Sequence, residues 1–139
     1  MKKIFVSSFL LIAVTMLYAQ KFEQLNKLVA TDRAVENNLG TSVAISGNYA
    51  VAAGSEIPSI GASSNCNCVY VFEKNLTGEW KQLQKLITTD ASSPNRFGYS
   101  VSISGNNIII GAPGDENYAG AAYIFQRSTN GSWIKVKKL

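Results

Sequence analysis

The feature that most constrains the fold is an internal repeat. The segment that begins at Leu28, LVATDRAVENNLGTSVAISGNYAVAAGS, matches without a gap the segment that begins at Leu86, LITTDASSPNRFGYSVSISGNNIIIGAP. Further on, VYVFEKNLTGEW, which ends at Trp80, matches AYIFQRSTNGSW, which ends at Trp133. The offset falls from 58 to 53 residues between the two matches, so the first unit holds five extra residues. A repeat of this length indicates an architecture built from similar supersecondary units.

Each unit is predicted to form four strands. SVAIS and SVSIS alternate apolar with small polar residues, as half-buried strands do. AVAAG and IIIGA are continuous apolar or small runs, and VYVF and AYIF are rich in β-branched and aromatic residues. WKQLQKL and WIKVKKL alternate again, which predicts that Trp80, Leu83, Trp133 and Val136 point inward. We therefore expect an all-β fold of antiparallel four-stranded blades, as in a β-propeller, and the alternative is a β-sandwich that holds a duplication.

The N-terminal residues 1–19 have the order of a secretory signal peptide. Two lysines follow Met1, an apolar run extends from Ile4 to Leu17, and the small residue Ala19 comes next. The run is short for a transmembrane helix, so we expect cleavage after Ala19 and a mature chain without a membrane span. The mature chain would carry a net charge of +2 with no run of lysine or arginine, which disfavours a nucleic-acid partner.

Two short motifs in the second unit carry a family resemblance. Phe97-Gly98 begins its first strand, and Gly111-Ala112-Pro113 ends its second strand. With the Tyr-x-Phe strand that follows, these residues resemble the FG-GAP repeat of integrin-α-type β-propellers. The first unit departs from the motif, because Leu39-Gly40 and Ala53-Gly54-Ser55 stand at the matching positions.

The resemblance implies two blades and one additional strand. Blade one would span 39–86 and blade two 97–139, while residues 21–28 would form an outer strand that closes the last blade of a ring. Propellers contain about 4–8 blades, so we expect this chain to be a fragment, a truncated product, or a part that joins further blades or copies of itself.

The amino-acid composition excludes several kinds of catalytic and metal site. The chain has no histidine, which excludes a Ser-His-Asp triad and histidine-ligated metals. We expect no enzyme, no catalytic residues, no cofactor and no metal ligands.

Integrin-type blades often carry a D-x-D-x-D-G calcium loop, which neither unit has; the nearest sequence is Gly114-Asp115-Glu116-Asn117. Calcium needs about 6–8 oxygen ligands, and this segment supplies only two carboxylates and an amide. It is therefore either part of a calcium site or a solvated polar loop. The matching loop of the first unit, residues 55–58, contains one acidic residue.

Three other features have structural interpretations. Cys66 and Cys68 lie in the inserted loop, and an exported protein favours a disulfide over a free pair of thiols. A bridge between residues two apart would be strained, so the alternatives are a labile bridge and an intermolecular link. Asp32 and Asp90 occupy equivalent positions, which predicts a repeated turn. Lys135, Lys137 and Lys138 alternate with apolar residues, which indicates the solvent face of a strand.

Two sequences fit the N-glycosylation pattern. They are Asn75-Leu76-Thr77 and Asn130-Gly131-Ser132, at the same hairpin of each unit. Because both lie in the same hairpin, the matches favour turn chemistry that occurs twice, and they matter only if the source glycosylates at this motif.

The functional hypothesis is an exported, non-catalytic interaction module. It would bind a protein or glycan in adhesion or surface recognition through the loops 55–67 and 113–120, because loops carry function on a rigid scaffold. One alternative is the propeller portion of a larger secreted enzyme whose catalytic domain is absent here. Another is an assembly of two-blade chains in which the 22–28 strand pairs with the edge of a neighbour.

Overall fold

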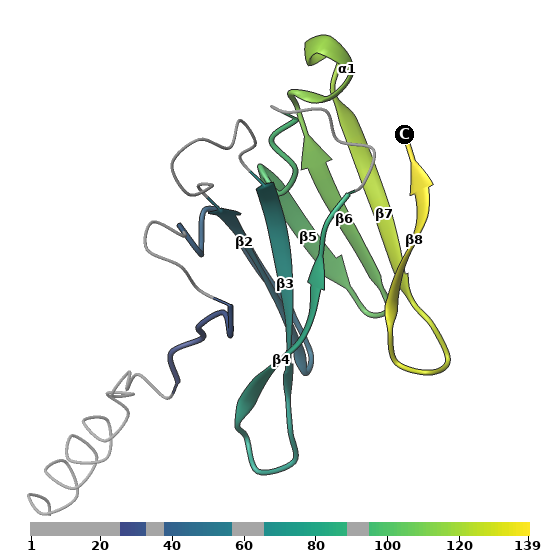
Figure 1. Ribbon diagram of the computed structural model, residues 1–139. Coiled ribbons are helices and arrows are strands. Elements are labelled where there is room, and N and C mark those ends of the chain that lie inside the picture. The colour runs from purple at the N-terminus through teal and green to yellow at the C-terminus, as the bar shows by residue number, and fades with distance from the viewer. Residues whose placement is uncertain (1–25, 33–37, 57–65, 89–94) are drawn as a thin grey trace, which may run out of the picture.

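The computed structural model describes residues 26–32, 38–56, 66–88 and 95–139 and consists of two four-stranded antiparallel sheets (Figure 1). The first sheet contains β1 (Val43–Ser46), β2 (Tyr49–Glu56), β3 (Cys66–Lys74) and β4 (Trp80–Leu86) in that order. The second contains β5 (Ser100–Ser104), β6 (Asn107–Ala112), β7 (Ala121–Arg127) and β8 (Trp133–Lys138), with the one-turn α1 (Asp115–Tyr118) between β6 and β7. The all-β prediction, with a four-stranded antiparallel blade from each repeat unit, is confirmed.

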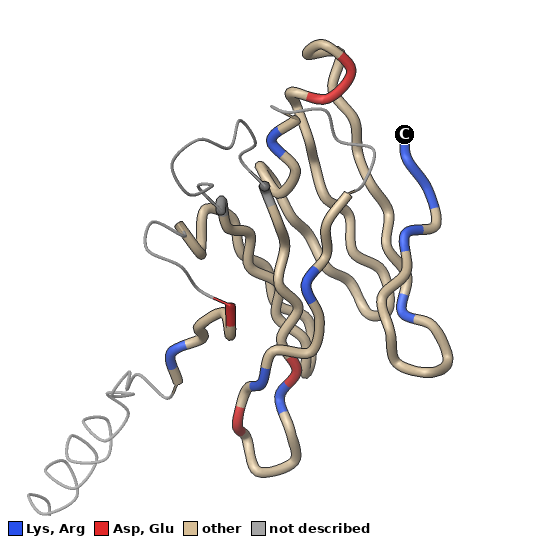
Figure 2. The backbone as a smooth tube through the Cα atoms, in the orientation of Figure 1, with Lys and Arg blue, Asp and Glu red and all other residues tan. Residues whose placement is uncertain are grey.

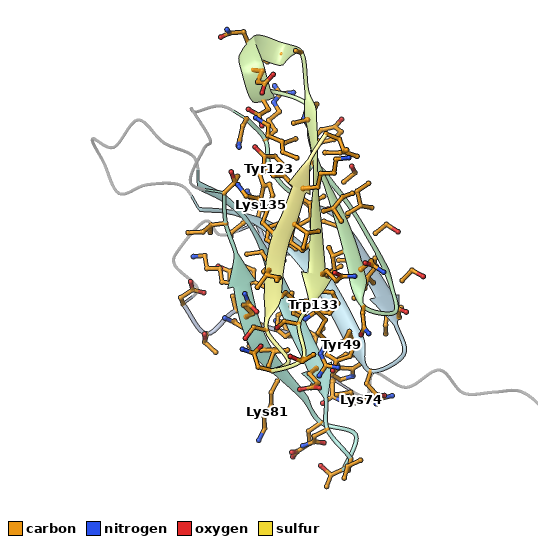
Figure 3. All side chains as sticks on the ribbon, turned by 90° about the vertical axis from the view of Figure 1, so that its right-hand side faces the viewer. Tyr49, Lys74, Lys81, Tyr123, Trp133 and Lys135 are labelled. Carbon is orange, nitrogen blue, oxygen red and sulfur yellow. The ribbon has the colours of Figure 1, made fainter. Side chains whose placement is uncertain are left out.

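The two sheets pack face to face over one core. Because side chains alternate along a strand, β2 and β3 direct Val51 and Val71 toward the second sheet. That sheet contributes mostly larger residues to the core, among them Ile108, Ile110, Tyr123, Phe125 and Trp133. Phe97 of the FG motif is 2% exposed and contacts the rings of Tyr123 and Phe125. Figure 3 shows Tyr49 and Trp133 close together, and their ring centroids are 5.8 Å apart across the sheets.

The two blades have the same strand register. A row across the first sheet pairs Ala44 with Val51, Val51 with Val71, and Val71 with Gln84. The corresponding row of the second sheet contains Ser102, Ile109, Ile124 and Lys137, paired in the same way. Each position of one blade therefore has a structural counterpart in the other.

Both outer strands contain a β-bulge that the alternation did not predict. Val71 pairs with Gln84 and Phe72 with Gln82, which leaves Leu83 as the extra residue. In the second blade the pairing omits Val136 in the same way. Leu83 is 42% exposed and Val136 50%, so the prediction that they point inward is wrong; a bulge interrupts the alternation of faces. Trp133 is buried as predicted, and Trp80 is half-buried.

The N-terminal segment crosses the outer face of the first sheet. Leu28 and Ala30 pack there against a cluster that includes Tyr70 and Phe72. The Thr31 N–H donates a hydrogen bond to the Gln82 Oε1 at 2.9 Å, on β4. Residues 26–28 are not assigned to a strand here, and the predicted closing strand over 21–28, which would pair with the last blade of a ring, stays a prediction.

The remainder of that predicted strand, residues 21–25, and the predicted signal peptide, residues 1–19, lie outside the described residues. In the part of the chain that the structure describes, no helix has the length and apolar character needed to cross a membrane.

Candidate functional site

Loop 113–120 and the described ends of loop 55–67 lie at the same end of the two sheets. The Gly114 N–H donates to the Asn95 carbonyl at 3.0 Å, and the Gly98 N–H donates to the Gly111 carbonyl at 3.1 Å. The segment before β5 therefore lies against the loop that follows β6, where α1 stands out in Figure 1. Residues 57–65 of the other loop lie outside the described residues, but its flanking residues Glu56 and Cys66 pair at the end of β2. We call this end of the blades the loop edge.

The loop between β6 and β7 is fixed by a buried carboxylate. The Asp115 residue is only 2% exposed, and its side chain accepts hydrogen bonds from the Tyr123 hydroxyl and from the Glu116 N–H at 2.9 Å. The Lys138 Nζ lies 3.1 Å from the Asp115 Oδ2 and 2.9 Å from the Glu116 Oε1. Figure 2 shows the acidic residues of α1 and the lysines along β8, near the C-terminus.

These contacts set the protonation states at neutral pH. Burial raises the pKa of Asp115, but hydrogen bonds from Tyr123 and Lys138 outweigh it and hold the pKa below its ordinary value. Burial and the adjacent Asp115 carboxylate raise the pKa of Tyr123. The hydrogen bond to Glu116 raises the pKa of Lys138, against a smaller opposing effect of desolvation. The cluster therefore contains a carboxylate, a neutral phenol and an ammonium group.

The Lys138 ammonium stands where a calcium ion would have to bind. It contacts both carboxylates, Asp115 and Glu116, that the sequence offers in this loop. Among the described residues, no three of the His, Cys, Asp and Glu side chains converge as a metal site. Calcium requires about 6–8 oxygen ligands, so the geometry fits an internal ion pair better than a calcium loop.

The role of Lys138 differs from the prediction that this residue lies on the solvent face of a strand. A signal was present, since Tyr70 and Lys85 have the same spacing as Tyr123 and Lys138. Each tyrosine pairs directly with its lysine across the last two strands of its blade.

The first blade contains a related cluster, whose carboxylate belongs to Asp32 of the N-terminal segment. The Lys85 Nζ lies 2.7 Å from the Asp32 Oδ2, and this hydrogen bond is the main cause that lowers the pKa of Asp32. A second hydrogen bond joins Asp32 to Tyr70. Residues 31–32 form a turn, as predicted, but the side chain of Asp32 also ties the N-terminal segment to β4. The equivalent Asp90 lies outside the described residues.

The outer surface of the loop edge displays aromatic and polar side chains. Tyr99 is 67% exposed and Tyr118 is 65% exposed. Glu116, Asn117 and Tyr118 have φ values of 48°, 57° and 70°, and Arg96 has a φ of 55°. Such left-handed conformations are uncommon outside glycine and often accompany functional loops. The buried Asp115 contacts hold this strained loop in one conformation.

The turn interpretation of the two N-glycosylation patterns is confirmed. The Asn75 Oδ1 accepts hydrogen bonds from the Thr77 N–H at 3.0 Å and the Glu79 N–H at 2.8 Å. The Asn130 Oδ1 accepts one from the Ser132 N–H at 3.0 Å. Both asparagines thus close the hairpin between the third and fourth strands.

Of the two cysteines, Cys68 has a described side chain. Cys68 is buried, and its Sγ lies 3.7 Å from the Gly54 carbonyl to which it donates. The side chain of Cys66 lies outside the described residues, so a disulfide in this loop stays a prediction.

Comparison with known proteins places both blades in one family. A family model described as the FG-GAP repeat matches residues 22–72 and 80–125. The two matches begin at Phe22 and Trp80, which are equivalent positions of the internal repeat, and each covers the first two strands and most of the third strand of a blade. No curated protein and no solved structure matches the chain.

Proposed function

The chain belongs to the FG-GAP repeat family, and on this premise we propose that it is the non-catalytic interaction module of an exported protein. It binds a protein or glycan ligand, in adhesion or surface recognition, through the loop edge. The observation that carries the proposal is the pair of exposed tyrosines, Tyr99 and Tyr118, on loops that internal contacts hold in place.

The side chains at this edge suit recognition. Tyrosine and arginine are enriched among the residues that dominate binding energies, because each offers a large contact area together with hydrogen-bonding groups. Tyr99 and Tyr118 lie on the surface, and Arg96 is exposed beside Phe97 of the FG motif. A loop already fixed by Asp115 loses little conformational entropy when a ligand binds, which favours affinity.

The charged groups at this edge support binding rather than catalysis. The Asp115 carboxylate and the Lys138 ammonium satisfy each other, and the Tyr123 hydroxyl donates to Asp115. A general acid or base needs a pKa near the working pH, whereas these shifts move the pKa values of all three groups away from neutrality.

A binding assay tests the proposal. The purified chain would be applied to an array of glycans and to a panel of purified extracellular proteins, and the dissociation constant of each ligand measured by surface plasmon resonance. The double variant Tyr99→Ala/Tyr118→Ala is expected to weaken binding by about tenfold or more, which corresponds to about 1.4 kcal/mol or more.

The matched control is Leu76→Ala. Leu76 is fully exposed in the hairpin between β3 and β4, at the opposite end of the blade, and its removal should leave affinity unchanged. The proposal fails if neither the glycan array nor the protein panel yields a ligand with saturable binding. It also fails if the double variant binds as tightly as the unmodified chain. Amino-terminal sequencing of secreted material tests export separately, with Gln20 expected as the first residue.

A further inference from the structure

A small pocket lies between the two blades, at the end opposite the loop edge. It has a volume of about 270 Å³ and belongs to both blades. The first blade contributes Glu73, Leu83 and Gln84, and the second contributes Arg127, Asn130, Gly131 and Ser132. The last three form part of the hairpin between β7 and β8. Ligand pockets often form where two units of a structure meet, and none of these residues belongs to the loop edge.

The first blade fixes the position of Arg127. Its guanidinium lies over the ring of Tyr49, 4.7 Å from the ring centroid. The Tyr49 hydroxyl in turn donates a hydrogen bond to the Glu73 carboxylate at 2.6 Å. The hairpin also packs close to the guanidinium, since a Cβ on Gly131 would lie 3.7 Å from the Arg127 Nη2. The charged group is therefore held in one place before any ligand binds, which favours affinity.

The Arg127 guanidinium nevertheless lacks hydrogen-bond acceptors. Its Nη2 lies 3.8 Å from the Glu73 Oε1, which is too far for a hydrogen bond, and its Nε is buried without a partner. Among the residues that the structure describes, no group accepts a hydrogen bond from this side chain. The side chain is 32% exposed, so its remaining donors are accessible from the pocket. Because polar groups inside proteins almost always have a partner, this guanidinium indicates an acceptor from outside the chain.

The pocket contains one charge of each sign. Burial and the hydrogen bond to Glu73 raise the pKa of Tyr49, so its hydroxyl remains a donor and Glu73 remains the acceptor. An anion on Arg127 would lie beside the Glu73 carboxylate, and a cation on Glu73 would lie beside the guanidinium. Like-charge repulsion therefore disfavours ions of both signs. A neutral ligand with adjacent donor and acceptor groups satisfies both charged side chains.

The bulge in β4 gives the pocket its apolar wall. Leu83, the extra residue of the bulge, is 42% exposed and lines the pocket. Bulges redirect side chains in this way beside functional sites. The next residue, Gln84, accepts a hydrogen bond from the Trp133 N–H and donates one to the Trp133 carbonyl, both at 2.8 Å. These two bonds join the blades at the pocket and keep its walls in a fixed arrangement.

The internal repeat provides matched substitutions for the two charged residues. Lys74 occupies the position of Arg127 in the first blade, and its Nζ lies over the Trp80 ring, 5.6 Å from the centroid. Gln126 occupies the position of Glu73 in the second blade. Arg127→Lys and Glu73→Gln therefore introduce residues that the same fold accepts at equivalent positions. The first removes the planar guanidinium fork, and the second removes the carboxylate charge.

We propose that this pocket binds one unit of a neutral saccharide. Of two adjacent hydroxyl groups on the sugar ring, one would accept a hydrogen bond from Arg127 and the other would donate one to Glu73. An apolar C–H face of the ring would lie on Leu83. The volume is below the roughly 300–1,000 Å³ of pockets for drug-sized ligands, so one ring fits better than a chain. Peptides combine donors and acceptors too, but they are recognised along sheet edges and grooves rather than in a small pocket.

Isothermal titration calorimetry of the purified full chain tests this proposal. The probes are the methyl glycosides of glucose, galactose, mannose and N-acetylglucosamine, and the comparison probes are acetate and a capped diglycine peptide. At least one glycoside is expected to bind with one-to-one stoichiometry and a dissociation constant of roughly 1 mM, whereas the comparison probes should not bind.

Four variants locate the binding. Arg127→Lys and Glu73→Gln should each weaken it by about tenfold or more, because each removes a charge-assisted hydrogen bond, and circular dichroism should show unchanged folding. Lys74→Arg makes the reverse exchange at the equivalent position of the other blade and should leave affinity unchanged. The double variant Tyr99→Ala/Tyr118→Ala should also leave it unchanged, which separates this pocket from the loop edge.

The proposal is overturned if none of the four glycosides gives saturable binding, or if either Arg127→Lys or Glu73→Gln binds as tightly as the unmodified chain. It is also overturned if the Tyr99→Ala/Tyr118→Ala variant loses the binding, which would assign the sugar to the loop edge. Saturable binding of acetate would indicate an anion site, and saturable binding of the capped diglycine a peptide site. Either result would replace the neutral saccharide as the ligand of this pocket.

Discussion

The Lys138 Nζ lies 3.1 Å from the Oδ2 of the buried Asp115, and this contact joins the last strand to the loop after β6. Because Tyr123 also donates to Asp115, replacing the carboxylate by an amide removes one acceptor from two donors. We expect Asp115→Asn to lower the free energy of unfolding by about 1–3 kcal/mol in urea titration. Glu116→Gln is the control, because the Glu116 side chain is 65% exposed and should change stability by no more than about 0.5 kcal/mol.

The same carboxylate predicts a dependence of stability on pH. The pKa of Asp115 in the folded chain lies below its ordinary value of 3.8. A group with a lowered folded pKa stabilises the protein above its unfolded pKa, and that contribution disappears as the pH falls through the folded value. The stability difference between the unmodified chain and Asp115→Asn should therefore be constant near neutral pH and shrink below about pH 4. A difference that stays unchanged on acidification would contradict the assignment.

Calcium should not stabilise the chain. Lys138 already contacts both carboxylates of the loop, so binding would require the ion to displace an ammonium group. A ligand that binds only the folded state raises the melting temperature, so thermal melting with and without millimolar calcium measures the effect. We expect no shift. A rise that Asp115→Asn abolishes would restore the calcium interpretation.

The repeat allowed the strands to be predicted from the sequence, but it did not predict all the side-chain contacts between them. The matching segments predicted two blades of the same construction, and the equal registers around Val71 and Ile124 confirm it. The acid that meets each tyrosine was not predictable, because Asp32 comes from the N-terminal segment and Asp115 from a loop within the second blade. The repeat alignment instead pairs Asp32 with Asp90.

The two FG-motif glycines offer a matched test of blade packing. Gly40 and Gly98 have φ values of 101° and 90°, so alanine would strain the backbone by about 1–2 kcal/mol at either position. Of these two glycines, only Gly98 faces the other blade, where the added Cβ would lie 3.0 Å from the Ala53 Cβ. Overpacking adds about 1–3 kcal/mol, so Gly98→Ala should destabilise the chain clearly more than Gly40→Ala. Equal losses in urea titration at low protein concentration would show that the blades do not pack closely there.

Two leucines of β4 test the bulge that the alternation did not reveal. Leu86 is 2% exposed between the sheets, whereas Leu83 is the extra residue of the bulge and is 42% exposed. Leu86→Ala should lower the free energy of unfolding by about 2–5 kcal/mol, because it leaves a cavity in the core. Leu83→Ala should lower it by less than about 1 kcal/mol, because little apolar surface returns to water. Comparable losses for the two variants would mean that Leu83 points into the core, as strict alternation along the strand predicts, and that the bulge does not form in solution.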